Sequence, residues 1–419
     1  MSTAVDCLDN NVLHNVRKQS RNSINRTLAD AGLMESKKKY LFRISLECAE
    51  IDFACAEPLN VFLLIAHMKE IEQLTNTLLD KEDLNSGQAV VAASLMASPQ
   101  VDLAAKQAFL IALSEKGETA TEVAAFAAAF RKLALDPGVE AWAPQAIDVC
   151  GTGGDGSSTF NISTAVSFII AAEGVPVFKH GNRSITSKCG SADLIEGLGI
   201  RLDAPHELLR ESLKELNFCF FFAPAFHPAF KEIMPVRKAL AEQKRRSIFN
   251  LLGPLINPGR PAYQLMGVFA QAWVEPIAGA LDEIGLKAGL VAHCTPEEGL
   301  NLDELSCVGR NHVAGFGSFR GRLGDLTVEE AGLTNSNLDS LSGGNVDENI
   351  RILNLIFNGQ YEEVSEGLIN SILFNAGAAF WIAGRSDDLS SGVELARELL
   401  KSGRAGQWLK KAQSFYSDK

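Results

Sequence analysis

The stretch from Ala146 to Lys179, "AIDVCGTGGDGSSTFNISTAVSFIIAAEGVPVFK", decides the fold. A short apolar segment leads into a glycine-rich loop, an apolar helical segment closed by Gly174, and a second apolar segment. A strand, a helix and a strand in this order predict a β-α-β unit with parallel strands and a right-handed crossover. Further strands are expected at 218–224, 263–269 and 288–294, with helices between them. The sequence therefore predicts an α/β domain with a mainly parallel central sheet, followed by a helical tail from Glu363.

Residues 68–138 have a different pattern. They are rich in Ala, Leu, Glu and Lys, and apolar residues recur at helical spacing, which predicts a run of amphipathic helices. Breaks are expected at "DLNSG" (83–87), "ASPQ" (97–100) and "KGETA" (116–120), and Pro137-Gly138 ends the block. We therefore expect a helical domain at 68–138 and the α/β domain at 139–419.

Residues 1–67 form a segment unlike the rest. Asn, Ser and Lys are frequent up to Tyr40, and helical periodicity is interrupted. We expect a poorly ordered or loosely packed extension, with a helix starting at Met68. The apolar stretch from Phe42, "FRISLECAEIDFACAEPLNVFLLIAH", leaves open that part of the extension packs on the helical domain.

The composition of the 419-residue chain limits its partners. A net charge of −12 argues against non-specific nucleic-acid binding. The longest apolar run, "VFLLIA" from Val61, is far shorter than the ~20 residues of a membrane helix. The eight cysteines form no C-x-x-C pair, as in a cytoplasmic protein with reduced thiols. We expect a cytoplasmic protein that binds neither nucleic acid nor membrane.

The glycine-rich loop, "GTGGDG" from Gly151 to Gly156, matches G-x-G-x-x-G. In a dinucleotide fold this loop runs directly into the helix, and an acid ends the second strand. Here "SSTFNIST" intervenes and the second strand ends in Lys179. Glycine N–H groups and a helix start near Thr159 instead predict a site for phosphate or diphosphate.

Polar side chains follow the loop. Thr159, Asn161, Ser163 and Thr164 can donate to phosphate oxygens, and a hydroxyl such as that of Ser163 can ligate Mg²⁺. Helix capping by Asn161 or Ser163 is the structural alternative. Capping explains one of these residues, not all four.

A second loop, "KHGNRSITSKCGSAD" from Lys179 to Asp193, follows the second strand. Ligands of open α/β sheets bind at this edge, outside the carboxyl ends of the strands. Lys179 and Arg183 bring positive charge, although either alone is also typical of a solvated surface. Asn182 can both donate and accept, which suits a substrate with an amine beside a carboxylate.

Five motifs in order resemble the anthranilate phosphoribosyltransferase family. They are "GTGGDGSSTFNIST", "KHGNRSITSKCGSAD", "HPAFKEIMPVRK", "IFNLLGPLINP" and "LDELS", and the resemblance covers about residues 68–415. It implies a homodimer in which a small helical domain, with further helices from about 225–255, packs on a larger domain of the nucleoside phosphorylase/phosphoribosyltransferase type. It also implies transfer of the phosphoribosyl group of 5-phospho-α-D-ribose 1-diphosphate to the amine of anthranilate, in tryptophan biosynthesis. The products are N-(5-phosphoribosyl)anthranilate and diphosphate.

The resemblance also implies which residues form the site. Its donor residues are Gly151, Gly154, Asp155, Thr159, Asn161, Ile162, Ser163, Thr164, Lys179, His180, Gly181, Asn182, Arg183, Ser184, Ile185, Thr186, Ser187 and Ser191. Its anthranilate residues are Gly151, Asn182 and Arg237, with His180 and His227 near the acceptor route. Its magnesium ligands are Ser163, Asp303 and Glu304. No covalent nucleophile is implied. By themselves, Asp303 and Glu304 could equally be a carboxylate pair at a helix start, without a metal.

The chain departs from the family pattern at three places. Thr186 and Cys189 stand where the family commonly has Ser, and a short insertion separates Arg237 from "SIFN". Two alternative functions remain open at this point. A pyrimidine nucleoside phosphorylase would lack "KHGNR", and a non-catalytic nucleic-acid-binding relative would be basic and lack the acid pair.

Overall fold

The computed structural model describes residues 57–419 except 155–156, 158, 184–187 and 297–299, and the side chains only from residue 66. Most of the predicted extension, residues 1–56, therefore lies outside the described residues. The helix expected to start at Met68 instead begins at Glu57, as α3 (Glu57–Leu79). A proline is tolerated in the first turn of a helix, and no Gly or Pro interrupts the chain between Pro58 and Met68.

Three further helices complete the N-terminal bundle, at the breaks expected from the sequence. They are α4 (Ser86–Ala97), α5 (Leu103–Lys116) and α6 (Ala120–Leu133). Asn85, Asp102 and Thr119 cap their N-termini with side-chain oxygens, which satisfies backbone N–H groups that have no partner within the helix.

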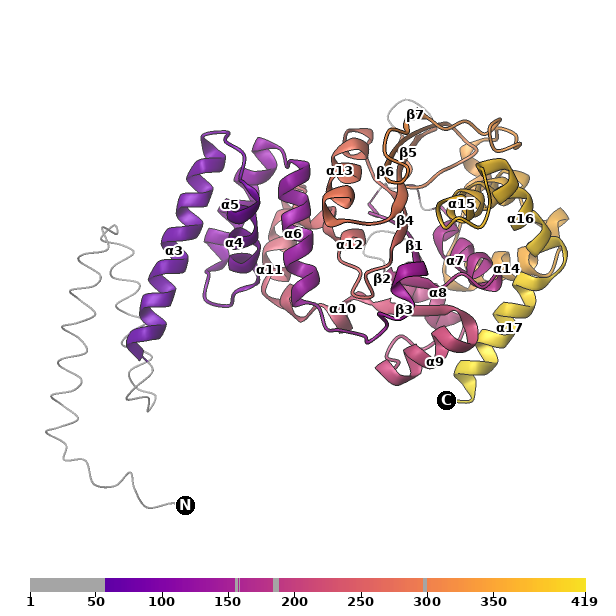
Figure 1. Ribbon diagram of the computed structural model, residues 1–419, viewed down its shortest axis with the longest axis horizontal. Coiled ribbons are helices and arrows are strands. Elements are labelled where there is room, and N and C mark those ends of the chain that lie inside the picture. The colour runs from indigo at the N-terminus through magenta and orange to yellow at the C-terminus, as the bar shows by residue number, and fades with distance from the viewer. Residues whose placement is uncertain (1–56, 155–156, 158, 184–187, 297–299) are drawn as a thin grey trace, which may run out of the picture.

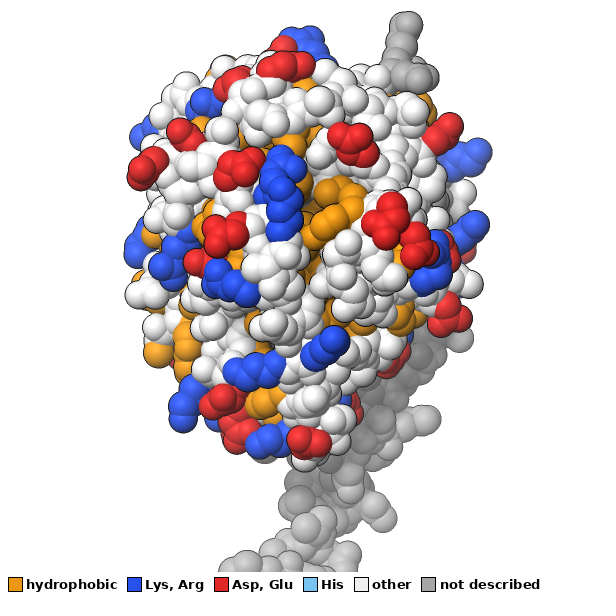
Figure 2. Space-filling view, turned by 90° about the vertical axis from the view of Figure 1, so that its right-hand side faces the viewer, with side chains coloured by type: hydrophobic (Ala, Val, Ile, Leu, Met, Phe, Trp, Pro, Cys, Tyr) orange, Lys and Arg blue, Asp and Glu red, His pale blue; other side chains and the backbone are white. Residues whose placement is uncertain are grey.

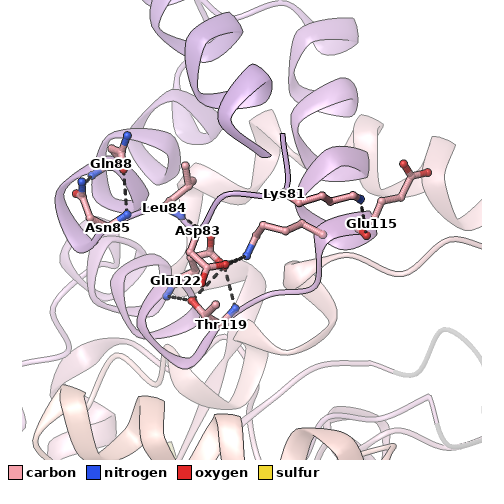
Figure 3. A network of polar contacts seen from close by, with 9 residues as sticks. Lys81, Asp83, Leu84, Asn85, Gln88, Glu115, Thr119 and Glu122 are labelled. Carbon is pink, nitrogen blue, oxygen red and sulfur yellow. Dashed lines mark hydrogen bonds and ion pairs between the residues drawn. The ribbon is translucent and has the colours of Figure 1, made fainter. Parts of the chain in front are cut away.

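A buried carboxylate, Glu122, fastens the N-terminus of α6 to the α3–α4 connection (Figure 3). It accepts from the N–H of Leu84 at 2.9 Å and the N–H of Thr119 at 2.8 Å. Lys116 completes the network with contacts of 2.9 Å to Glu122 and 2.6 Å to Asp83. Because both carboxylate oxygens of Glu122 accept hydrogen bonds, the side chain can be buried at little cost.

A later segment of the chain returns to pack on this bundle (Figure 1). Its helices are α10 (Ala223–Phe226), η2 (Pro228–Glu232), α11 (Met234–Glu242), η3 (Ile248–Asn250) and α12 (Leu252–Leu255). Val236 and Phe249 join Phe109 and Phe126 in one buried apolar cluster. Residues far apart in sequence therefore share one helical core beside the sheet.

The central sheet has seven strands in the order β3-β2-β1-β4-β5-β6-β7. They are β1 (Ile147–Gly151), β2 (Val177–Gly181), β3 (Phe218–Phe222), β4 (Tyr263–Gly267), β5 (Ala288–Thr295), β6 (Arg310–Gly317) and β7 (Leu323–Asp325). The first five are parallel and β6 and β7 are antiparallel. The mainly parallel sheet is confirmed, whereas β6 and β7 were not expected from the sequence.

Helices cover both faces of the sheet (Figure 1). The helices are α7 (Ile162–Ala172), α8 (Ser191–Gly197), α9 (His206–Leu216), α13 (Val274–Ile284), α14 (Val346–Phe357), α15 (Glu366–Ile382), α16 (Leu389–Lys401) and α17 (Arg404–Ser417). Leu265 packs with α7 and α15 on one face, and the next residue, Met266, packs with α13 and the bundle on the other. This alternation follows from the two-residue period of a strand.

The face formed by α14, α16 and α17 carries Lys and Arg side chains interspersed with Asp and Glu (Figure 2). Within the described residues, no helix is long and apolar enough to cross a membrane.

Candidate active site at the carboxyl edge of the parallel strands

The glycine-rich loop leaves β1 at Gly151 and turns over the end of the sheet. Gly153 and Gly154 have φ values of 71° and 76°, a conformation that favours glycine. The loop is anchored to β4 by Thr152, whose N–H donates to Gly267 O at 3.0 Å and whose Oγ1 accepts from Phe269 N at 3.0 Å. Successive N–H groups in such a turn form a concavity suited to an anion. Asp155 lies outside the described residues.

Helix α7 begins at Ile162, so the expected start near Thr159 is wrong. Thr159 instead forms an isolated β-bridge with Ser342, and the N–H of Phe160 donates to Leu341 O at 2.9 Å. This contact with a distant segment keeps residues 159–160 extended. Asn161 stands at the N-cap position without a side-chain capping bond. Its Nδ2 donates to Cys189 O at 3.2 Å, which ties the two loops together.

Two of the residues expected at the donor site, Thr164 and Lys179, have buried side chains. Thr164 is fully buried in α7, and its Oγ1 has no partner among the described residues. Lys179 is also buried, at the end of β2. Its Nζ donates to Val149 O at 3.0 Å and to Ser163 Oγ at 3.3 Å. Burial lowers the pKa of Lys179, and the nearby carboxylate of Asp148 acts in the opposite direction. Lys179 therefore lies beneath the loop, next to Ser163.

The second loop begins at Gly181, where α8 approaches β2 closely. A Cβ on Gly181 would lie 2.4 Å from Ser191 Oγ, so only glycine fits. Asn182 Oδ1 accepts from the N–H of Arg183 at 2.8 Å. Residues Ser184, Ile185, Thr186 and Ser187 lie outside the described residues.

Arg183 does not direct its charge at the glycine loop in this structure. Its guanidinium pairs with Asp193 at 3.0 Å and with Glu196 at 2.8 Å, both on α8. The side chain of Arg183 is about half exposed, so these pairs are weak and exchangeable.

The acid pair lies directly over the ends of β1 and β4. Asp303 Oδ2 accepts from the N–H of Gly153 at 2.5 Å. A Cβ on Gly151 would meet the Asp303 carboxylate, and one on Gly267 would meet the Asp303 backbone. Glu304 is near enough to Lys179 to raise the pKa of that amine. In the described part of the chain, no three residues among His, Cys, Asp and Glu are grouped as a metal cage.

Of the expected acceptor residues, His180 lies on β2, whereas His227 and Arg237 lie in the returning helical segment. His180 Nε2 is 3.1 Å from His227 Nε2, and both histidines are buried. Arg237, on α11, is partly buried, and its guanidinium forms no hydrogen bond or ion pair with any described residue. Burial lowers the pKa of its guanidinium, so a carboxylate would be a favourable partner.

One residue at the site, Arg246, was not singled out in the sequence. It ends the inserted segment, and its Nη2 donates to Gly154 O at 2.8 Å. Its Cζ lies 3.8 Å from the centroid of the Phe269 ring. The only signal in the sequence was the displacement of "SIFN" by the insertion.

Comparison with known proteins agrees with this geometry. Residues 143–406 match the glycosyl transferase family a/b domain, and residues 72–134 match the helical bundle domain of the same family. The anthranilate phosphoribosyltransferase of Methanobrevibacter smithii is 39% identical over 333 residues, covering 78% of this chain and 94% of that protein. That of Petrotoga mobilis is 40% identical over 307 residues, covering 73% and 86%. This chain belongs to the anthranilate phosphoribosyltransferase family.

Solved structures of anthranilate phosphoribosyltransferases share the fold. The crystal structure from Thermus thermophilus superposes with a TM-score of 0.72 at 38% identity, covering 82% of this chain and 99% of that chain. A structure from Saccharomyces cerevisiae, solved in complex with PRPP and Mg, superposes with a TM-score of 0.68 at 23% identity, covering 85% and 98%. The predicted combination of a helical domain and a larger α/β domain is confirmed, and so is the assignment to a phosphoribosyltransferase family.

Proposed function

We propose that this enzyme transfers the phosphoribosyl group of 5-phospho-α-D-ribose 1-diphosphate to the amine of anthranilate in tryptophan biosynthesis. The observation that carries the proposal is the convergence of the glycine loop and the acid pair at one sheet edge, through the 2.5 Å contact of Asp303 with Gly153. A phosphorylated sugar with a diphosphate leaving group needs both a set of N–H donors and a place for a divalent cation.

The residues present fit Mg²⁺. Asp303 and Glu304 provide two carboxylates, and Ser163 Oγ lies 3.3 Å from Lys179 Nζ at the same edge. Mg²⁺ is usually held by one or two carboxylates together with substrate phosphates, rather than by an all-protein cage. We propose Ser163, Asp303 and Glu304 as its protein ligands. When bound, Mg²⁺ would neutralise charge on the leaving diphosphate.

The chain's own residues supply the rest of the chemistry. The N–H groups of residues 151–154, with Thr159, Asn161 and Ser191, would bind phosphate oxygens. Lys179, beneath Ser163, would add positive charge where the diphosphate departs. Asn182 and Arg237 would hold the amine and the carboxylate of anthranilate, so that the amine is presented in line with the breaking bond.

The wider assignments are also proposals. We propose a cytoplasmic homodimer, with an N-terminal extension before α3, a helical domain from α3 to about residue 138 that also takes in the helices from about 225–255, and an α/β domain over the rest of 139–419. The core around α7 and α15 and the core of the bundle are two clusters, and the bundle cluster also takes in residues of β4 and α13, so the two domains pack closely together. Sedimentation equilibrium tests the dimer, and a single species at the monomer mass would contradict it.

The activity is tested by following the consumption of anthranilate through its fluorescence. The full chain is assayed with and without phosphoribosyl diphosphate and Mg²⁺. We expect consumption only when both are present. The double variant Asp303→Ala/Glu304→Ala should lose most of its magnesium response. Phosphate-dependent release of a base from a pyrimidine nucleoside, without anthranilate consumption, would instead assign a nucleoside phosphorylase.

A further inference from the structure

The histidine pair has proton positions that follow from its hydrogen bonds. His180 Nδ1 lies 3.1 Å from Gly253 O, and because a carbonyl only accepts, this nitrogen must carry a proton. Burial lowers the pKa of His180 to about 3 and that of His227 to about 4, so both rings are neutral at neutral pH. A neutral imidazole has one N–H, which leaves His180 Nε2 as an acceptor.

His227 must therefore donate to His180. The two Nε2 atoms are 3.1 Å apart, and His180 Nε2 has no proton to give. The N–H of His227 is then at Nε2, and Nδ1 keeps a lone pair. Among the described residues, nothing donates to this nitrogen, and it does not cap η2. This nitrogen is not among the unpartnered polar atoms that are fully sealed from solvent, so it keeps slight solvent access although the His227 side chain is almost wholly buried.

The histidine pair joins the two segments that carry the proposed anthranilate residues. His180 immediately precedes Gly181 and Asn182 at the end of β2, and His227 begins the segment that leads to Arg237 on α11. A Cβ on Gly253 would meet no atom within 4 Å, and Gly253 is exposed. Open space therefore adjoins Gly253, the residue whose carbonyl accepts from His180.

We propose that Nδ1 of His227 accepts the proton that the anthranilate amine loses during the transfer; this inference rests on the proposed function. The amine nitrogen forms a bond to C1 of the ribose while the C1–O bond to diphosphate breaks. The electron pair of that bond leaves with the diphosphate. The N–H proton passes to Nδ1, and the resulting imidazolium returns it to water.

The surroundings suit a weak base of this kind. An arylamine that is forming a bond to carbon becomes a strong acid, so a base of low pKa can take its proton. Arg131 on α6 and Lys179 on β2 oppose protonation of His180, and burial opposes protonation of His227. His180 acts as a positioning residue, because its fixed tautomer leaves Nδ1 of His227, rather than Nε2, without a proton.

Two substitutions at one position separate proton transfer from simple hydrogen bonding. His227→Gln keeps an amide N–H near Nε2 for His180 but removes the acceptor at Nδ1. His227→Asn places an amide oxygen near Nδ1, which can accept a hydrogen bond but cannot take a proton. We expect both variants to lower kcat about 100-fold, with donor KM and melting temperature near those of the wild type. A His227→Asn variant that keeps wild-type kcat would overturn proton transfer.

The tautomers can be read directly by ¹⁵N NMR of histidine-labelled full-length protein, with the signals assigned from His180→Gln and His227→Gln. At pH 7 we expect an unprotonated Nδ1 and a protonated Nε2 for His227, and the reverse for His180. The opposite pattern would overturn the inference. A wild-type protein that does not consume anthranilate would instead contradict the proposed function, whereas active wild type with a fully active His227→Gln variant contradicts only the role of His227.

Discussion

Asp303 Oδ2 accepts a hydrogen bond from the N–H of Gly153 at 2.5 Å, in the middle of the proposed diphosphate site. The N–H of Gly153, which would donate to a phosphate oxygen of the bound substrate, thus donates to a carboxylate oxygen instead. The contact closes the turn in which Gly153 and Gly154 adopt positive φ. The proposed divalent cation would compete with this N–H for Asp303, and a cation bound to Asp303 would free the N–H for the donor substrate.

The first prediction follows from this competition. Asp303→Ala should bind metal-free inorganic diphosphate about tenfold more tightly than the wild type, because a charge-assisted hydrogen bond no longer has to be displaced. In the same variant, Mg²⁺ should improve diphosphate binding much less. Isothermal titration calorimetry measures both. Glu304→Ala is the matched control, since it removes the neighbouring negative charge. An equal gain in both variants would assign the effect to net charge rather than to the contact with Gly153.

Arg246 gives the second prediction, because it joins the inserted segment to the glycine loop. Its contacts are the 2.8 Å bond to Gly154 O and the stacking on Phe269. Arg246→Ala should raise the donor KM severalfold and leave the anthranilate KM nearly unchanged. Cation–π contacts at exposed sites contribute roughly 0.5–1 kcal/mol, so the melting temperature should fall by only a few degrees. Arg245→Ala, next in sequence but paired with Glu115, is the control; equal kinetic effects in both would contradict a specific role.

The third prediction concerns Arg237, whose guanidinium has no ion-pair partner among the described residues. Arg237→Ala should raise the anthranilate KM roughly 10- to 100-fold, the equivalent of one charged hydrogen-bonded pair. The donor KM should change little. Arg237→Lys should recover only part of the affinity, because Lys lacks the two-donor fork. Steady-state kinetics with each substrate varied in turn distinguishes these outcomes, and equal increases in both KM values would place anthranilate elsewhere.

The sequence predicted the parts of this structure that depend on local patterns. The β1-α7-β2 unit follows from apolar segments around a glycine loop, and the breaks between bundle helices follow from capping residues such as Asn85 and Thr119. Strand β6 was missed because polar and apolar residues mix in "RNHVAGFG", whose burial along the strand is irregular. Its partner, β7, is only three residues long.

The parts of the site that the sequence could not predict depend on contacts between distant segments. The start of α7 is set by Leu341 and Ser342, and Arg183 is drawn to Glu196 on α8. The bond between His180 and His227 joins β2 to a helix that packs with the bundle. Motif order indicated which residues gather at the sheet edge, but it carried no information on which of them contact one another.

The fourth prediction is a pH dependence of stability that originates at Glu118, just before α6. Burial, and secondarily the negative charge of Glu122, raise the pKa of Glu118 to about 7 in the folded protein. The folded state therefore binds a proton more tightly than the unfolded state, and stability falls as pH rises from about 4.5 to about 7. Above that window the free-energy cost of burying the ionised Glu118 carboxylate is constant, and below it this cost is absent.

Glu118→Gln, which carries no charge at any pH, should melt at a higher temperature than the wild type at pH 8 and at nearly the same temperature at pH 4.5. Glu140→Gln, at an exposed position beyond the bundle, is the control and should follow the wild type at both values. Thermal unfolding followed by circular dichroism gives the comparison, and a Glu118→Gln variant that loses stability at pH 8 would show that the carboxylate is charged and stabilising in the folded state.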